Sequence, residues 1–244
     1  MTMAASSAPQ AAAADKGQEG AGGDFECLDR LLRGRFSCRA FKDEPVPRAL
    51  ITSILQAAQR TASWCNAQPW VLYLAGGEPL ERLRQSLAAL APGATAQPDL
   101  AWPAEYRGVY RERRRECGWG LYESLGIAKG DRQASAAQAA ENFRMFGAPH
   151  LAVVTSDAAL GTYGAIDCGA YVGNFMLAAH SLGLASVAQA SLAAHPRMLR
   201  EHLGIPDDRI IVCGISFGYA DTAHPANRFR TQRADPAACV VWRD

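Results

Sequence analysis

Apolar residues recur at helical spacing along much of the chain. Residues 46–60 are the clearest case, with Pro47 at their start and an apolar stripe made up of Leu50, Ile51, Ile54, Leu55 and Ala58. This pattern predicts an amphipathic helix. The same spacing predicts further helices over residues 25–35, 78–90, 135–146 and 195–205. Residues 164–184 are apolar on nearly every side, so the helix expected there should be buried.

Shorter apolar runs between these segments predict strands. They cover residues 70–77, 148–157, 185–191 and 208–221. Residues 91–103 contain three prolines and a glycine and are expected to form a loop. There is no internal repeat and no linker, so the pattern favours one helix-rich α+β domain.

The first 23 residues differ from the rest in composition. They consist mostly of alanine, glycine, serine and glutamine, and they lack the basic and leucine-rich regions of a signal peptide. Because they offer little apolar surface to bury, we expect residues 1–23 to be a disordered tail and residues 24–244 to form the domain.

Composition excludes several classes of function. The 244 residues carry a formal net charge of +1, which argues against a general nucleic-acid binder. No apolar run approaches the roughly 20 residues of a membrane-spanning helix. The seven cysteines are scattered without a CxxC pair, which fits a reducing cytoplasm better than a disulfide framework. The five histidines have no metal-ligand spacing, so no metal is expected, and no nucleophile–base pair is evident.

The stretch "RFSCRAF" is the first candidate for chemistry. It places two arginines and a hydroxyl at alternate positions, and these side chains point the same way if the chain is extended. Arginine forks match phosphate oxygens, and a serine adds another donor, so Arg35, Ser37 and Arg39 could hold a phosphate. Taken alone, a stretch of this kind is more often a solvated turn with two surface arginines.

The stretch "ASWCNAQPW" is the second candidate. Asn66 and Gln68 carry amides, which donate and accept hydrogen bonds. Such groups suit the uracil-like edge of a flavin ring, which also does both. The alternative is an ordinary polar loop between a helix and a strand.

Together these stretches resemble the opening of the nitroreductase family of FMN-dependent oxidoreductases. The resemblance continues through "DCGAYVGNFMLAAHSLGLASV", "REHLGIPDDRIIVCGISFGYAD" and "NRFRTQRADPAACVVW", and it covers roughly residues 25–242. Ala62 stands where the family commonly has proline, and Thr231 stands where many members have lysine. The arginine-rich segment "EYRGVYRERRRECGWGLYESLGI" is similar to the nitrobenzoate reductase branch.

The resemblance implies an FMN site with four groups of residues. The phosphate and ribityl chain would contact Arg35, Phe36, Ser37, Arg39, Arg230 and Arg233. The ring or ribityl chain would lie near Ser63, Trp64, Asn66 and Gln68, partly from the opposite subunit. Flavin N5 would face the loop formed by Gln189, Ala190 and Ser191. Further ring contacts are implied for Asn142 and Arg144.

The resemblance also implies a fold and an activity. The fold would be a central mixed or antiparallel sheet surrounded by helices, in an intertwined homodimer with residues 165–182 at the interface. The activity would be ping-pong hydride transfer from NADH or NADPH, through flavin N5, to a nitroaromatic compound or a quinone. A flavin enzyme of the same fold with another reaction, such as reductive dehalogenation or flavin fragmentation, and a non-catalytic flavin-binding module remain alternatives.

The arginine-rich segment allows two interpretations. Residues 105–116 interleave five arginines with three glutamates, which is typical of a solvated helix face. The alternative is that one of its arginines or tyrosines contacts a carboxylate on an aromatic substrate. The sequence leaves the physiological acceptor and the choice between NADH and NADPH open.

Overall fold

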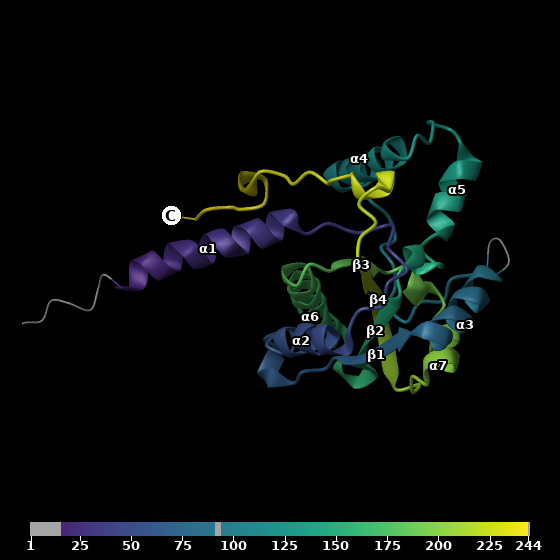
Figure 1. Cartoon of the computed structure of the whole chain (residues 1–244), viewed down its shortest axis with the longest axis horizontal. Helices are drawn as coiled ribbons and strands as arrows, with labels where there is room; N and C mark the ends of the chain where they lie inside the picture. The colour runs from purple at the N-terminus through teal and green to yellow at the C-terminus, as the bar shows by residue number, and fades with distance from the viewer. Residues whose placement is uncertain (1–15, 91–93, 244) are drawn as a thin grey trace, which may run out of the picture.

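The computed structural model describes residues 16–90 and 94–243, and Figure 1 shows their arrangement. Its helices are α1 (Lys16–Gly34), α2 (Arg48–Ala58), α3 (Gly77–Ala88), α4 (Gly108–Ser124), α5 (Arg132–Ala140), α6 (Gly161–Ser181) and α7 (Pro196–Leu203). Its strands are β1 (Val71–Gly76), β2 (His150–Asp157), β3 (Ala185–Gln189) and β4 (Arg209–Gly218). The loop expected after residue 90 has no helix or strand in its described part, residues 94–103.

The four strands form one antiparallel sheet in the order β1-β2-β4-β3. This agrees with the expected central sheet, and it leaves β3 at one edge. The pairing of β2 with β4 shifts where Val154 faces Cys213 but Thr155 faces Ile211, so Val212 forms a β-bulge. The bulge reverses which face the β4 side chains point to.

Helices cover both faces of this sheet (Figure 1). Leu151 and Val153 of β2 pack in one apolar cluster with side chains of α3 and α7. Ala152 and Val154 pack in a second cluster with side chains of α2 and α6. This alternation along β2 follows the two-residue period of a strand, and it explains why residues 151–154 are apolar without a break.

Helix α6 is buried on one face only. Tyr171 and Phe175 lie in the core with almost no exposure, but Tyr163 and Ile166 are each 58% exposed. A Cβ atom placed on Gly169 or Gly173 would meet no atom within 4 Å. The prediction of a helix buried all round is therefore wrong for the single chain, which leaves an apolar outer face uncovered.

The start of α1 also differs from the prediction. Helix α1 begins at Lys16, so residues 16–23 are helical and not part of a disordered tail. Four of these eight residues are glycine, so intrinsic helix propensity does not explain why α1 begins this early. Residues 1–15 lie outside the described part of the chain.

The helix predicted over residues 135–146 ends early, at Ala140. Met145 and Phe146 then adopt positive φ angles of 55° and 54° in a tight turn. Both side chains are buried in the core, so packing overrides their local helical preference.

The ends of the described chain lie away from the sheet. In Figure 1, α1 and the segment after β4 project from the body in the same direction. Phe25 of α1 is 69% exposed, and Trp242 near the C-terminus is 78% exposed. None of the helices in the described part of the chain has the length and apolar character needed to cross a membrane.

Candidate functional site

Residues 35–41 run beside the outer edge of β3. Ser37 pairs with Ser186 in a parallel bridge, and the Cys38 N–H donates to the Ser186 carbonyl at 3.1 Å. Cys38 is fully buried. Because side chains alternate along an extended segment, the opposite, partly exposed side carries Arg35, Ser37 and Arg39.

The chain returns to this edge after β4. The Asn227 side chain accepts the Arg39 N–H at 2.7 Å and donates to the Ala40 carbonyl at 2.8 Å. The guanidinium carbon of Arg230 lies 3.9 Å from the centre of the Phe36 ring, which is a cation–π contact. Segments from opposite ends of the sequence thus meet where the phosphate contacts were predicted.

The arginines of these two segments have no anionic partner in the described part of the chain. Burial, and after it the nearby Arg233 guanidinium, lowers the pKa of Arg35. Burial also lowers the pKa of Arg39. Within residues 16–90 and 94–243, neither these two arginines nor Arg230 or Arg233 forms an ion pair with a carboxylate. Arg35 and Arg39 are partly buried, whereas Arg230 and Arg233 are exposed. Cations that gather without anionic partners favour binding of an anion.

A cavity of about 390 Å³ adjoins this cluster, between α4 and the C-terminal segment. Arg113 of α4 lines it together with Arg230 and Arg233. The two segments approach closely, because a Cβ atom on Gly120 would lie only 2.5 Å from the Phe229 ring. Glycine at this position lets the C-terminal segment rest on the helix.

Two further arginines, Arg107 before α4 and Arg114 within it, have local contacts. Arg107 forms an exposed ion pair with Glu105, and the Arg114 guanidinium lies 5.1 Å from the centre of the Tyr106 ring. These contacts fit the interpretation of a solvated helix face. Arg113 is the exception, because it faces a cavity.

The amide loop, residues 63–68, has an unusual backbone. Cys65, Asn66 and Gln68 have positive φ angles of 51°, 55° and 48°. Residues other than glycine seldom adopt this conformation, and where they do, the site is often functional. The Ser63 hydroxyl stabilises the turn by accepting the Gln68 N–H at 2.9 Å.

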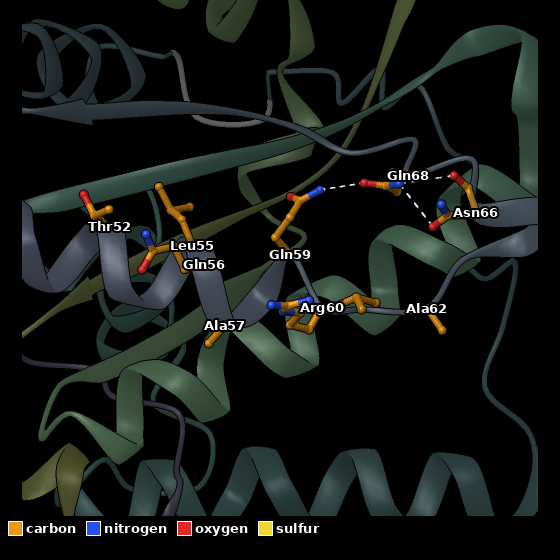
Figure 2. A pocket seen from close by; sticks show the side chains of 10 residues that line it. Thr52, Leu55, Gln56, Ala57, Gln59, Arg60, Ala62, Asn66 and Gln68 are labelled. Carbon is orange, nitrogen blue, oxygen red and sulfur yellow. Dashed lines mark hydrogen bonds between the residues drawn. The ribbon is translucent and has the colours of Figure 1, made fainter.

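A chain of amides runs across this loop (Figure 2). Gln59 at the end of α2 donates to Gln68 Oε1 at 2.8 Å, and Gln68 Nε2 donates to Asn66 Oδ1 at 3.1 Å. The three amides border a surface hollow of about 1090 Å³, which is otherwise lined mainly by α2. No hydrogen bond from Asn66 Nδ2 occurs among the described residues, so this donor can reach a ligand.

The same loop is docked on the partly exposed helix α6. The Trp64 N–H donates to the Asp167 carboxylate at 3.1 Å, and the Trp64 ring lies edge-on to Tyr163 with centroids 4.4 Å apart. The hollow beside Asn66 and the cavity beside Arg230 share no lining residue. The two volumes are therefore separate within the described part of one chain.

The turn after β3 is held by a polar network. Buried Gln189 donates to the Asn142 carbonyl at 2.9 Å, and its Oε1 accepts the hydroxyl of fully buried Ser216 at 2.5 Å. Ser191 donates to Asn142 Oδ1 at 3.1 Å. The N–H groups of Ala190 and Ser191 meet no acceptor among the described residues, so they are available to a ligand.

Two residues predicted to contact the ring also make contacts within the chain. The Asn142 side chain is engaged by Gln189 and Ser191, whereas the resemblance implied a contact to the flavin. Arg144 is exposed, lies 3.8 Å from the Glu141 carboxylate, and lines a groove of about 700 Å³ that Arg39 also borders. Among the described residues, neither side chain contacts the free N–H groups of Ala190 and Ser191.

Sequence reasoning missed three residues that support these groups. Ser216 and Asp167 are polar residues inside apolar segments, and that mismatch is a signal that could have marked them. Asn227 lies in a mixed segment where an asparagine is unremarkable, so only the structure reveals its contacts.

Known proteins resemble this chain over most of its length, including the regions described above. A family model described as "Nitroreductase family" matches residues 32–219. The chain is 35% identical to a 4-nitrobenzoate reductase of Nocardioides sp. (strain LMS-CY), over 90% of this chain and 92% of that protein. It is 34% identical to a 4-nitrobenzoate reductase of Pseudomonas putida, over 84% of this chain and 91% of that protein.

A solved structure gives the same result for the fold. The FMN-dependent nitroreductase NfnB from Mycobacterium smegmatis, in complex with NADPH, superposes with a TM-score of 0.85 at 31% identity. The match covers 90% of this chain and 99% of that one.

Proposed function

This chain belongs to the nitroreductase family, and we propose that it is an FMN-dependent NAD(P)H oxidoreductase that reduces nitroaromatic compounds. The relatives described above are reductases, and none of them supports dehalogenation, flavin fragmentation or a non-catalytic role. The related structure in complex with NADPH makes NADPH the expected donor.

The observation that carries the proposal is the cluster of unpaired arginines. Burial, and after it the nearby Arg233 guanidinium, lowers the pKa of Arg35, and no carboxylate offsets the two arginines among the described residues. A terminal phosphate would relieve this repulsion, because it accepts charge-assisted hydrogen bonds from both. The residues present therefore fit FMN.

The remaining groups of the site fit the rest of the cofactor. Ser37 adds a hydroxyl donor beside the phosphate-binding arginines. The free N–H groups of Ala190 and Ser191 would donate to flavin N5, and Asn66 and Gln68 would bind the polar edge of the ring. FMN, when bound, supplies the redox chemistry, because it can take a hydride from NAD(P)H and give an electron pair to an acceptor. The protein then binds and orients, and we assign no catalytic acid or base.

The same proposal includes a homodimer. The outer face of α6 leaves Tyr163 and Ile166 exposed, and Gly169 and Gly173 leave room for another backbone. Exposed apolar surface of this kind marks an interaction site. A two-fold dimer through α6 would bring the amide loop, which is docked on α6, toward the arginine cluster of the other subunit. This supports a site built from two chains.

A cytoplasmic location also belongs to the proposal. All seven cysteines are free thiols, which is the usual state in a reducing compartment. Burial raises the pKa of Cys168 to about 11 and of Cys213 to about 12, so both are inert core residues.

One experiment tests the function. The purified protein should show a flavin absorption spectrum, and anaerobic NADPH should bleach it. Addition of 4-nitrobenzoate should then restore the colour. A colourless protein that fails to bind added FMN would contradict the cofactor. Bleaching without recovery by any nitroaromatic compound would contradict the assigned acceptor.

A further inference from the structure

We propose that Asn227 is a positioning residue that fixes the spacing between the two arginine-bearing segments of the phosphate site. These segments are the N-terminal arm, residues 35–41, and the C-terminal arm, residues 227–233. The inference rests on the FMN site proposed above. It adds a residue that would act on the cofactor through other groups.

The Asn227 side chain is almost fully used by backbone partners. It is 5% exposed, and its Oδ1 accepts the Arg39 N–H at 2.7 Å. Its Nδ2 donates to the Ala40 carbonyl and to the Asp221 carbonyl, each at 2.8 Å. One side chain thus joins three backbone groups, two of them in the N-terminal arm.

The backbone of the same residue orders the C-terminal arm. The Asn227 carbonyl accepts a hydrogen bond from Arg230 Nη1 at 2.7 Å, and its N–H donates to the His224 carbonyl at 3.1 Å. Arg230 in turn lies over the Phe36 ring. Asn227 therefore fixes the Arg39 backbone and the Arg230 side chain together.

The need for such a link follows from charge. Both arms carry arginines, and like charges repel. Burial, and after it the Arg233 guanidinium, lowers the pKa of Arg35. An unlinked pair of arms would separate in the absence of an anion. A short amide that donates twice and accepts once, without adding charge, holds them in place for the phosphate.

The test compares Asn227→Ala with a control substitution elsewhere. Asp99→Asn is suitable, because Asp99 is mostly buried, accepts two hydrogen bonds from Arg200, and lies outside both arms. Affinities of the apoprotein for FMN and riboflavin are measured by flavin fluorescence, and thermal unfolding is recorded for each variant.

We expect Asn227→Ala to weaken FMN binding about tenfold more than riboflavin binding, as loss of roughly one charge-assisted hydrogen bond would. Asp99→Asn should lower the unfolding temperature and leave the ratio of the two affinities unchanged. An unchanged ratio of the two affinities in Asn227→Ala would overturn the inference, whether both affinities stay the same or both fall by the same factor.

A second measurement covers the case in which Asn227→Ala does not fold. In the wild-type apoprotein, the Arg39 amide should exchange with deuterium as slowly as the amides of β3. Exchange as fast as in exposed loops would overturn the inference. If wild-type protein shows no preference for FMN over riboflavin, the proposed phosphate site itself is wrong and Asn227 has no phosphate to position. If the wild-type protein prefers FMN over riboflavin and Asn227→Ala keeps the same ratio of affinities, the inference about Asn227 is wrong but the proposed phosphate site stands.

Discussion

The arginine arms and the amide loop are built in opposite ways. The arms come from distant parts of the sequence and are joined by the Asn227 amide and by the contact of Arg230 with Phe36. The amide loop is a short local turn, exposed to solvent, with positive φ angles at three residues. Its contacts outside the loop are made mainly by Gln59 and Asp167.

This difference indicates how a flavin site can be divided between chains. The arms are complete within one chain and have a charge that only an anion would offset. The loop has polar groups directed toward a hollow that the arms do not reach in the same chain. The arms should therefore decide affinity for the phosphate, and the loop should contribute to the ring only after a second copy has docked.

The largest expected effect comes from removing that second copy. Ile166→Glu places a charge on the exposed apolar face of α6, where burial against a partner would strongly disfavour it. Light scattering should report a monomer, and bound FMN should be lost. Leu74→Glu, at an exposed position of β1 far from β3 in the sheet order, should leave the dimer and its FMN intact. A monomeric Ile166→Glu protein that keeps its FMN would show that one chain is sufficient.

The next largest effect on FMN affinity is expected from a change in the arms. Arg35→Ala should weaken FMN binding by about one to two decades, because a charge-assisted hydrogen bond contributes about 1.5–3 kcal/mol. Arg35→Lys should recover only part of this, since an ammonium lacks the planar fork. Riboflavin affinity should change little in either variant. Equal losses for FMN and riboflavin would mean that Arg35 supports the fold or the ring.

A smaller effect on flavin affinity is expected from a change in the amide loop. Asn66→Gly removes the amide but keeps a residue that adopts the φ angle of 55° without strain. Loss of one neutral hydrogen bond, about 0.5–1.5 kcal/mol, should weaken FMN and riboflavin by the same factor, up to about tenfold. Titration of both flavins checks this. A loss confined to FMN would place Asn66 at the phosphate.

The smallest effect concerns the acceptor. If Arg113 contacts a carboxylate in its cavity, Arg113→Ala should raise the KM for 4-nitrobenzoate about threefold to tenfold, in line with one exposed hydrogen bond. The KM for uncharged nitrobenzene should hardly move. Arg107→Ala is the control, because Arg107 is paired with Glu105. Equal changes in KM for both substrates would mean that Arg113 belongs to a solvated helix face and does not contact the carboxylate.

Much of the fold could be predicted because its periodicity is local. The strands and the helix over residues 46–60 follow directly from apolar spacing. The early end of α5 could not be predicted, because the buried side chains of Met145 and Phe146 impose the turn from outside the segment. The apolar pattern alone did not predict that the outer face of α6 is exposed, since such a pattern does not distinguish a core from a subunit interface. Only the family resemblance pointed to an interface over residues 165–182.

The candidate site likewise has a part that could be predicted from the sequence and a part that could not. Arg35, Ser37 and Arg39 could be proposed from alternation and residue type alone. The supporting contacts could not, because Asn227 and Arg39 are 188 positions apart and meet only in the folded chain. Ser216 could have been noticed as a buried hydroxyl in an apolar strand, but its partner Gln189 could not have been named from the sequence.

The most direct test of a site shared between chains is complementation in a heterodimer. One tagged chain carries Arg35→Ala, and a differently tagged chain carries Asn66→Gly with Gln68→Gly. If the arms and the loop of one FMN site come from different subunits, one site of the heterodimer holds both defects and the other holds none. Titration should then show half of the sites binding FMN with wild-type affinity. Uniformly weakened binding at every site would show that the arms and the loop act within the same chain.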